Sequence, residues 1–186
     1  MVVENINGLE LKFETLPDLF SPKKLDNGTR LLIDTVRDIK PDYHRALDWG
    51  CGWGSLAIYL AKNQPDSDVL AIDSDIAATS TTTANAKLNG TDNLRVVISH
   101  GFDQIDKNTQ FDLIVSNPPT HRGREVVEDM IAQSFDKLQK DGVILIVVEA
   151  RLKPWVSKQL NKIFGDYKIV SRSNKHVVLS SAKVSQ

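Results

Sequence analysis

Residues 47–54, LDWGCGWG, decide the fold. A short apolar run ends at Asp48, and glycine then recurs at Gly50, Gly52 and Gly54 before a helical pattern begins. Glycine adopts positive φ without strain and lets a ligand approach the backbone closely. At the carboxyl end of a strand in an open α/β sheet, such a loop forms part of the binding crevice. The stretch therefore predicts a strand, a ligand-binding loop and a helix in succession.

The segments around this stretch alternate between strand and helix patterns. Short runs rich in Val, Ile and Leu predict buried strands, and the segments between them have the length and apolar spacing of helices. This alternation indicates a parallel sheet with helices on both faces. We expect strands at residues 45–49, 68–73, 94–98, 111–116 and 142–149, and helices at about 28–38, 55–63, 75–89, 124–140 and 153–164.

Hairpin patterns occupy both ends of the chain. Residues 2–13 alternate around Asn7-Gly8, a strong signal for a two-residue turn, and predict a β-hairpin extension over residues 1–18. Near the other end, residues 168–173 and 176–181 read as two strands with no room for a helix between them. They predict a terminal antiparallel hairpin at one edge of the sheet.

The predicted fold class is α/β, with a mostly parallel seven-stranded sheet and helices on both faces. No internal repeat, linker or low-complexity segment divides the sequence. A length of 186 residues suits one domain with a substantial core. We therefore expect residues 1–186 to form a single domain.

The composition argues against a membrane-spanning protein and against a small protein stabilised by disulfides. The chain is 41% hydrophobic and 25% charged, as in globular proteins, and no apolar run approaches the ~20 residues of a membrane span. No basic segment followed by an apolar block marks a signal peptide. Cys51 is the single cysteine, which excludes an internal disulfide and fits a reducing compartment. These features lead us to expect a cytoplasmic protein.

Charge is distributed unevenly along the chain. The net charge is −1, but residues 151–186 hold eight Lys/Arg against Asp166 alone, and the rest of the chain carries −8. Such a segment is either a solvated surface or a face that meets phosphates. The second possibility makes RNA a candidate partner.

A second acid supports a nucleoside-type ligand at the glycine loop. Asp73 ends the next strand, nineteen residues after Gly54, where a carboxylate can accept hydrogen bonds from ribose hydroxyls. A dinucleotide fingerprint, G-x-G-x-x-G/A, would need Gly or Ala at the position of Ser55. The glycines are out of phase with that pattern, so a dinucleotide is not favoured.

The other informative stretch is residues 113–119, LIVSNPP, a buried strand that ends in Asn117-Pro118-Pro119. An exocyclic amine on a planar base is a poor nucleophile because its lone pair is delocalised. The Asn117 side-chain carbonyl and the Pro118 backbone carbonyl can accept its two N–H bonds and aim the lone pair at an electrophile. This chemistry needs no metal. The alternative is a proline-stiffened turn without a catalytic role.

Three stretches, in order, carry a family resemblance: FSPKKLDNGT at 20–29, DWGCGWG at 48–54 and SNPPTHRG at 116–123. They resemble the small-domain (MTS) family of class I S-adenosylmethionine-dependent methyltransferases, which includes ribosomal RNA guanine-N2 methyltransferases. The resemblance implies a Rossmann-like fold, S-adenosylmethionine as cofactor and RNA as partner. The chain resembles the short single-domain members of the family more than the longer ones. The oligomeric state stays open, and a monomer is compatible with all of this.

The resemblance and the motifs together give a set of candidate site residues. Those for catalysis are Asn117, Pro118 and Pro119. Those for the cofactor are Phe20, Asp26, Thr29, Asp48, Gly50, Cys51, Gly52, Gly54, Asp73, Ser74, His100, Gly101, Phe102 and Asn117. Those for the substrate are Thr120, His121, Arg122 and Arg124.

Two positions depart from the family pattern. The family often has an acid after the third strand, which contacts the adenine amine, whereas this chain has His100 near that point. Either His100, a backbone group or Phe102 takes over the adenine contact. An aromatic residue commonly follows Asn-Pro-Pro and stacks on the target base, whereas this chain has Thr120. His121, Phe20 or Trp53 are then the candidates for a stacking face, and Trp155 is either a substrate contact or a packing residue.

The leading hypothesis is methylation of the exocyclic N2 amine of a guanine in ribosomal RNA. The same Asn-Pro-Pro chemistry serves adenine N6 and the side-chain amide of glutamine, so an adenine-N6 or a protein glutamine-N5 methyltransferase are the alternatives. A non-catalytic cofactor- or RNA-binding module is the hypothesis of another class, and the intact Asn117-Pro118-Pro119 argues against it.

Overall fold

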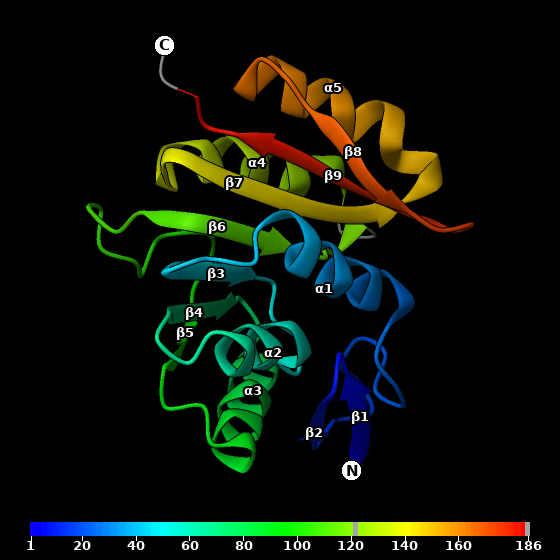
Figure 1. Cartoon of the computed structure of the whole chain (residues 1–186), viewed down its shortest axis with the longest axis vertical. Helices are drawn as coiled ribbons and strands as arrows, with labels where there is room; N and C mark the ends of the chain where they lie inside the picture. Colours follow the sequence, from blue (N-terminus) through cyan, green and yellow to red (C-terminus); the bar gives the residue numbers. More distant parts are fainter. Residues whose placement is uncertain (121–122, 185–186) are drawn as a thin grey trace.

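The computed structural model describes residues 1–120 and 123–184, and its centre is a seven-stranded sheet. The strand order is β5-β4-β3-β6-β7-β9-β8, with β1 and β2 paired separately (Figure 1). The strands are β1 Val2–Ile6, β2 Leu9–Phe13, β3 Arg45–Trp49, β4 Asp68–Asp73, β5 Leu94–Ile98, β6 Phe111–Ser116, β7 Leu138–Glu149, β8 Lys168–Arg172 and β9 His176–Ala182. The helices are α1 Asn27–Ile39, α2 Ser55–Asn63, α3 Ile76–Asn89, α4 Arg124–Lys137 and α5 Lys153–Phe164, and a short 3-10 turn, η2, covers Ala150–Leu152.

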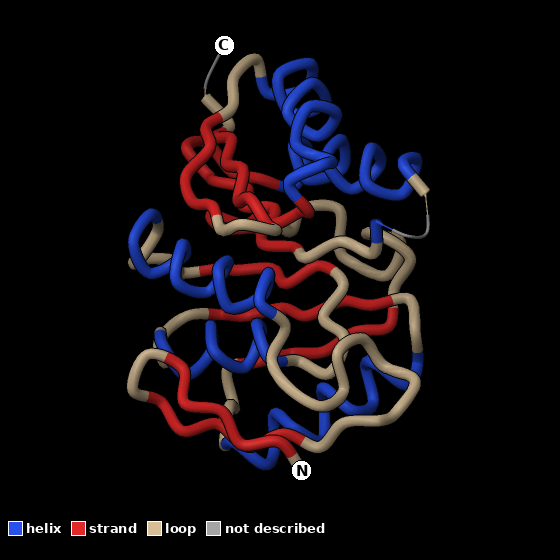
Figure 2. Tube along the Cα trace, turned by 90° about the vertical axis from the view of Figure 1, so that its right-hand side faces the viewer, coloured by secondary structure: helices blue, strands red, loops and turns tan. Residues whose placement is uncertain are grey.

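The predicted mostly parallel sheet is confirmed. Strands β5, β4, β3, β6 and β7 pair in parallel, whereas β9 is antiparallel to both β7 and β8. The terminal hairpin therefore places β9 between β7 and β8, and β8 becomes the edge strand. Figure 2 shows the strands as a layer with helices on either side.

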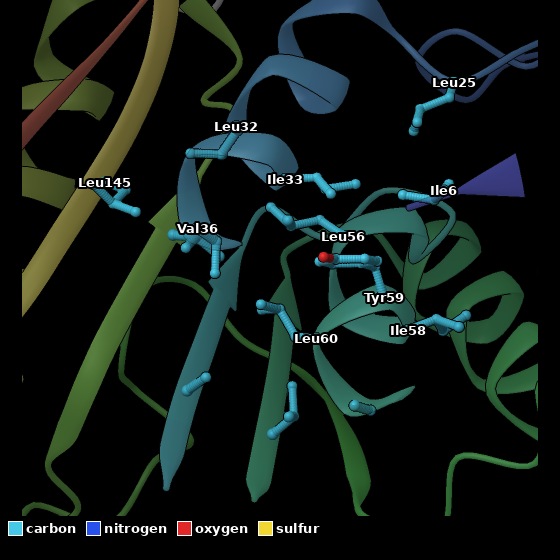
Figure 3. Packing of buried hydrophobic residues seen from close by; sticks show 14 of the residues in the cluster. Ile6, Leu25, Leu32, Ile33, Val36, Leu56, Ile58, Tyr59, Leu60 and Leu145 are labelled. Atoms are coloured by element: carbon cyan, nitrogen blue, oxygen red, sulfur yellow. The ribbon is translucent and has the colours of Figure 1, made fainter. Parts of the chain in front are cut away.

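Residues of alternate parity along the central strands face two separate cores, as the period of a strand requires. On one face, residues such as Ala46, Val115 and Val147 pack against α1, α2 and the hairpin. On the other, residues such as Leu47 and Ile114 pack against α4 and α5. Figure 3 shows the first core, where side chains of α1 and α2 meet Ile6 of the hairpin.

The N-terminal hairpin forms as its sequence predicts. Asn7 and Gly8 both have positive φ, of 51° and 87°, as a type I′ turn demands. Ile6, Leu11 and Phe13 are buried in the first core. The hairpin thus shares its apolar interior with the sheet.

Two asparagines of α3 hold the free edge of β2. Asn85 accepts a hydrogen bond from Glu14 N at 2.7 Å and donates to Glu14 O at 2.8 Å. One helical turn later, Asn89 makes the same pair of bonds with Lys12, at 3.0 and 2.7 Å. The helix is poor in intrinsic propensity because of its threonines, so this docking helps to stabilise it. Gly90, with φ 61°, is the C-cap that ends α3.

One boundary prediction was wrong. The helix expected over 124–140 ends at Lys137, and β7 begins at Leu138 rather than at residue 142. Leu138 pairs with Phe111, and the register then shifts before Val143 pairs with Leu113. Asp141, at φ 62°, marks this irregularity. Pairing with β6 overrides the local helical pattern here.

The fold positions the site by bringing strand ends together. The carboxyl ends of β3, β4, β5, β6 and β7 all lie at one edge of the sheet because these strands are parallel. Because the residues predicted for catalysis, Asn117, Pro118 and Pro119, follow β6 at this edge, we call it the catalytic edge. Within the described ranges, no helix is both long and apolar enough to span a bilayer.

Candidate active site

A cavity of about 930 Å³ opens at the catalytic edge. Most predicted site residues line it: Phe20, Asp26, Thr29, Asp48, Gly50, Cys51, Gly52, Asp73, Ser74, His100, Gly101, Asn117, Pro118, Pro119 and Thr120. Gly54, Phe102 and Arg124 are not brought to its wall, and His121 and Arg122 lie outside the described residues. Several lining residues were not predicted from the sequence, among them Asp18, Asp103, Asp129, Gln133, Glu149, Arg151 and His176.

The glycine loop is fixed by hydrogen bonds to the strand beside it. Gly50 N and Cys51 N both donate to Ile72 O, at 2.8 and 3.1 Å. Gly52 N donates to Asp73 Oδ2 at 3.1 Å, and Gly52 O accepts from Thr82 Oγ1 at 2.9 Å. The loop therefore presents a rigid backbone surface to the cavity.

Gly54 has a packing role that explains why it is glycine. Its φ is 90°, and a Cβ there would lie 2.8 Å from Thr82 Cγ2. Any other residue would be strained and would push α3 away from the loop. Gly54 thus sets the start of α2 and lies behind the cavity wall.

Asp48 lies at the base of the loop. Its side chain is 1% exposed, and Oδ2 accepts a hydrogen bond from Ala57 N at 3.0 Å. Burial raises the pKa of this carboxyl to about 7, because a charged form is costly where water cannot reach it. Since Asp48 also lines the cavity, a cationic ligand group would restore favourable solvation of its carboxylate.

Cys51 has the environment of a structural loop residue. It is buried, and desolvation raises the pKa of its thiol well above the usual value. A thiol in such surroundings is a weak nucleophile. Cys51 therefore serves the loop as a small buried side chain.

Asp73 joins two parts of the cavity wall. Oδ2 accepts from Gly52 N, and Oδ1 accepts from Asp75 N at 3.0 Å. Asp75 in turn caps α3 by accepting from Ala77 N at 2.8 Å. The carboxylates of Asp73 and Asp75 both line the cavity beyond the glycine loop.

The loop after β5 places Asp103 where the sequence analysis found no acid. Ser99 Oγ donates to Gly101 O at 2.8 Å and accepts from Gln104 N at 3.2 Å, which folds the loop back on itself. Asp103 thereby reaches the cavity. Phe102 turns away from it, with its ring centroid 4.8 Å from that of Trp49 in an edge-to-face contact.

Asn117 lies at the middle of the cavity, at the end of β6. Its Nδ2 donates to Asp26 Oδ2 at 3.1 Å and to Thr29 Oγ1 at 3.0 Å. Next to it, Pro118 O accepts from Thr120 N at 2.8 Å. A carbonyl oxygen has two lone pairs, so Pro118 O retains one for a further donor. Both predicted carbonyl acceptors therefore belong to residues that line the cavity, and each has a lone pair without a donor among the described residues.

Beyond Asn117 the cavity continues towards β7 and β9. Glu149 and His176 face each other across these strands in register, and both line the cavity. Arg151 Nε donates to Glu149 Oε2 at 2.6 Å, and this bond lowers the pKa of the Glu149 carboxyl. His176 Nδ1 is buried and has no hydrogen-bond partner among the described residues. The cavity thus has two ends, with Asn117 between them.

The tryptophans and Phe20 divide between packing and the cavity rim. Trp49 is buried in the core, and Trp53, 4% exposed, donates from Nε1 to Phe20 O at 2.9 Å. Phe20 is 62% exposed at the cavity rim. Trp155 joins α5 to α4, since Nε1 donates to Glu128 at 3.3 Å and Arg124 lies 5.4 Å from its ring centroid. Its described contacts are those of a packing residue.

This arrangement can hold a nucleoside-like ligand at one end and a planar amine at the other. No cluster of three or more metal-ligating side chains occurs within the described ranges. The chemical resources are buried or loop-bound carboxylates, a rigid glycine loop and the carbonyl acceptors of Asn117 and Pro118. They are suited to positioning two reactants rather than to covalent catalysis.

Comparison with known proteins gives a consistent result. The model of the family described as methyltransferase small domain matches residues 10–180. The chain is 38% identical to ribosomal RNA small subunit methyltransferase C of Actinobacillus pleuropneumoniae serotype 7, over 92% of this chain and 52% of that protein. It is 29% identical to YbxB of Bacillus subtilis, over 94% of this chain and 87% of that protein. The chain spans about half the length of the small subunit methyltransferase C relatives.

Solved structures agree with the sequence matches. The T. thermophilus 16S rRNA N2 G1207 methyltransferase RsmC, solved with AdoMet and guanosine, superposes with a TM-score of 0.89 at 25% identity, over 98% of this chain and 50% of that one. A ribosomal protein L11 methylase from Lactobacillus delbrueckii subsp. bulgaricus gives a TM-score of 0.72 at 22% identity, over 92% and 91% of the two chains. The second likeness concerns the fold alone.

Proposed function

Because the chain belongs to the methyltransferase small-domain family, we propose that it transfers a methyl group from S-adenosylmethionine to the exocyclic N2 amine of a guanine in ribosomal RNA. The observation that carries this proposal is the orientation of the Asn117 side-chain amide. Its amide nitrogen is held by Asp26 and Thr29, and its oxygen accepts no hydrogen bond from the residues that the structure describes.

The carboxylates at one end of the cavity suit the positive charge and the hydrogen-bond donors of S-adenosylmethionine. The glycine loop and Asp48 would hold the methionine portion, whose ammonium group would favour the ionised form of Asp48. Asp73 would accept hydrogen bonds from the ribose, and Asp103 is an acceptor for the adenine amine in place of the missing acid. When bound, the cofactor supplies an electrophilic methyl group on a sulfonium.

The protein's part in the chemistry is to position the amine. Asn117 Oδ1 and Pro118 O would accept its two N–H bonds, and the nitrogen lone pair would then point to the methyl carbon. The nitrogen–carbon bond forms as the carbon–sulfur bond breaks. The methylated nitrogen then loses one proton to water, so no strong general base is required.

The choice of guanine N2 is supported by relatives rather than by a base-specific contact. The RsmC structure that superposes on this chain was solved with guanosine, and its printed name specifies N2 of G1207. The cavity end beyond Asn117 contains Glu149, Arg151 and His176, whose polar groups could meet a base edge. Thr120 provides no ring for stacking, and Phe20, exposed at the cavity rim, is a described candidate for the stacking face.

The C-terminal basic residues fall into two groups once they are placed on the fold. Arg151 lies in η2 and Lys153 begins α5, both at the catalytic edge. Arg172 and Lys175 reach the same edge because the β8–β9 turn lies there. Lys175 O accepts from Ala150 N at 2.8 Å, which joins that turn to the end of β7. We define Arg151, Lys153, Arg172 and Lys175 as the catalytic-edge basic cluster. It is placed to meet RNA phosphates beside the cavity.

The opposite edge holds the other group. Lys168 begins β8 and pairs with Ser180, and Lys162 lies near the end of α5. Lys183 is turned inward, since its Nζ donates to Leu138 O at 2.8 Å. These residues lie at the opposite edge of the sheet from the catalytic-edge basic cluster. The exposed ones among them, Lys162 and Lys168, are matched controls for charge changes in that cluster.

The test is methyl transfer from labelled S-adenosylmethionine to undermethylated ribosomal RNA and to ribosomal assembly intermediates, followed by nucleoside mass spectrometry. We expect N2-methylguanosine. N6-methyladenosine, or label in a protein glutamine, would replace the proposed substrate with one of the two alternatives. Cofactor binding without transfer to any of these would support a non-catalytic module instead.

A further inference from the structure

We infer that Asp26 and Thr29 are positioning residues that orient and polarise the Asn117 amide, rather than residues that bind the cofactor. The inference rests on the proposed function, since it assigns to these residues a part in amine methylation. It also changes the role that the family resemblance implied for them. Three geometric observations carry it.

The first observation fixes which way the Asn117 amide points. An ionised carboxylate only accepts hydrogen bonds, so the group that faces Asp26 Oδ2 at 3.1 Å must be the Asn117 NH₂. Thr29 Oγ1, at 3.0 Å, accepts the second N–H. With both donors occupied, Oδ1 is the face of the amide left for the substrate. A flipped amide would present donors to a substrate amine that is itself a donor.

The second observation is that Asp26 is itself held in place. Its Oδ2 also accepts from Gly28 N at 2.8 Å and from Thr29 N at 3.1 Å, as the N-cap of α1. A helix N-terminus favours a negative charge at this position. The carboxylate that receives the Asn117 amide is therefore anchored to backbone groups and cannot rotate freely.

The third observation is the space around Gly28. A Cβ at this position would lie 2.9 Å from Asp26 Oδ2 and 3.1 Å from His176 Cδ2. A side chain here would displace either the capping carboxylate or the wall of the cavity. Residues 26–29 thus work as one device, in which Asp26 and Thr29 supply acceptors and Gly28 supplies room.

The charge on Asp26 adds an electronic effect to the orientation. In the chain from Asp26 carboxylate through the Asn117 amide to the substrate amine, each hydrogen bond strengthens the next. A charged acceptor on the nitrogen side makes Asn117 Oδ1 a better acceptor on the other side. It would therefore draw electron density onto the reacting amine nitrogen as its N–H bonds lengthen.

The variants that test this separate helix capping from contact with Asn117. Asp26→Ser keeps a good N-cap residue but shortens the side chain, so that Asn117 loses one acceptor. Asp26→Asn keeps an acceptor of the same reach without the charge. Thr29→Val removes the hydroxyl at nearly constant volume. Thr35→Val is the matched control on the same helix. Among the described residues, the Thr35 hydroxyl bonds only to Leu31 O, at 2.7 Å, and Thr35 does not line the cavity.

We expect kcat to fall about 10- to 100-fold in Asp26→Ser and by less in Asp26→Asn, because a hydrogen bond to a charged group is worth more than a neutral one. In Thr29→Val, kcat should fall to a smaller extent. Thr29→Ser, which keeps the hydroxyl, should retain much of the kcat that Thr29→Val loses. Calorimetric Kd for S-adenosylhomocysteine should change less than about threefold in all of them. The inference is wrong if the variants raise Kd for S-adenosylhomocysteine by the factors expected for kcat, while kcat at saturating cofactor stays at the wild-type value.

A second readout does not depend on activity. The side-chain NH₂ of Asn117, assigned in ¹⁵N spectra by its disappearance in Asn117→Asp, should exchange its protons slowly in the wild-type protein. It should exchange faster in Asp26→Ser and keep its behaviour in Thr35→Val. If the wild-type protein methylates no RNA, the proposed function fails but this measurement still decides the contact. An Asn117 signal unaltered by Asp26→Ser overturns the positioning role.

Discussion

The acid at the end of β4 holds the glycine loop at the end of β3, because Asp73 Oδ2 accepts a hydrogen bond from Gly52 N at 3.1 Å. Its other oxygen accepts from Asp75 N at 3.0 Å, so the carboxylate also fixes the start of α3. One side chain therefore couples the shape of the loop to the position of the neighbouring wall. A residue expected to contact a ribose has a structural role before any ligand arrives.

We expect Asp73→Ala to weaken binding of S-adenosylhomocysteine by about 1–3 kcal/mol, the usual effect of leaving buried polar partners unpaired. The Tm of the ligand-free protein should also fall, because Gly52 N and Asp75 N lose their acceptor. Calorimetry and thermal unfolding measure the two effects. Asp68→Ala, at the other end of β4, is the control, since Asp68 is an exposed residue in a surface ion pair with Arg45. Unchanged affinity in Asp73→Ala would move the ribose contact to another residue.

Asp48 predicts a pH dependence of both stability and binding. Its folded-state pKa of about 7 lies above the ordinary carboxyl value, so the folded ligand-free protein disfavours ionisation. Ionisation therefore costs stability progressively as pH rises from about 4 to about 7. Asp48→Asn, which retains an acceptor for Ala57 N, should raise Tm relative to wild type at pH 8, and the difference should shrink towards pH 4.

The same carboxyl should release protons when a cationic ligand binds beside it. Wild-type affinity for S-adenosylhomocysteine should rise as pH increases through 7, with a binding enthalpy that depends on the ionisation enthalpy of the buffer. Asp48→Asn should remove both dependences. Buffer-independent binding in the wild-type protein would mean that Asp48 keeps its protonation state and does not meet the ligand's ammonium group.

Asn117→Ala separates catalysis from binding. Removing one well-placed polar group from an active site typically costs about 100- to 1000-fold in kcat, and we expect a loss of that order here. Cofactor affinity should change little, because the alanine variant leaves the glycine loop and its acids intact. Asn174→Ala, in the exposed β8–β9 turn, serves as the control. Turnover that survives the loss of Asn117 would remove it from the mechanism.

Asn85→Ala tests how the hairpin is attached. Asn85 is fully buried and bonds to both Glu14 backbone groups and to Trp53 O, at 2.8 Å. Its loss should lower the free energy of unfolding by about 1–3 kcal/mol, measured with urea. Asn89→Ala removes the analogous contacts to Lys12 at a more exposed position and should cost less. Equal effects would mean that burial of Asn85 adds nothing.

Much of the sheet could be predicted because its signals are local. The strand over 45–49 and the helix over 55–63 match the structure to the residue, since the glycine loop between them marks both boundaries. Residues at strand ends, such as Asp48, Asp73 and Asn117, were placed in the cavity correctly for the same reason. Parallel pairing then brings these ends together without further information.

The remaining features depend on contacts that no local pattern encodes. Helix 124–140 was predicted too long because Leu138 pairs with Phe111 across the sheet. The pairing of His176 with Glu149 requires the strand register. The contact of Asp26 with Asn117 joins residues 91 positions apart and requires that α1 dock beside β6. Asp103 enters the cavity only because Ser99 folds its loop back.

Charge reversal tests where RNA binds. The double variant Arg172→Glu/Lys175→Glu alters the catalytic-edge basic cluster, and Lys162→Glu/Lys168→Glu makes the same change in net charge at the opposite edge. All four side chains are exposed, so neither variant should affect folding. We expect the first to raise KM for RNA and to reduce the slope of log KM against log salt by roughly 1–2, because two phosphate contacts are lost. The Lys162→Glu/Lys168→Glu variant should leave KM for RNA and its salt dependence nearly as in wild type. Equal effects of the two variants would mean that RNA responds only to overall charge, and the docking surface would then have to be sought elsewhere on the molecule.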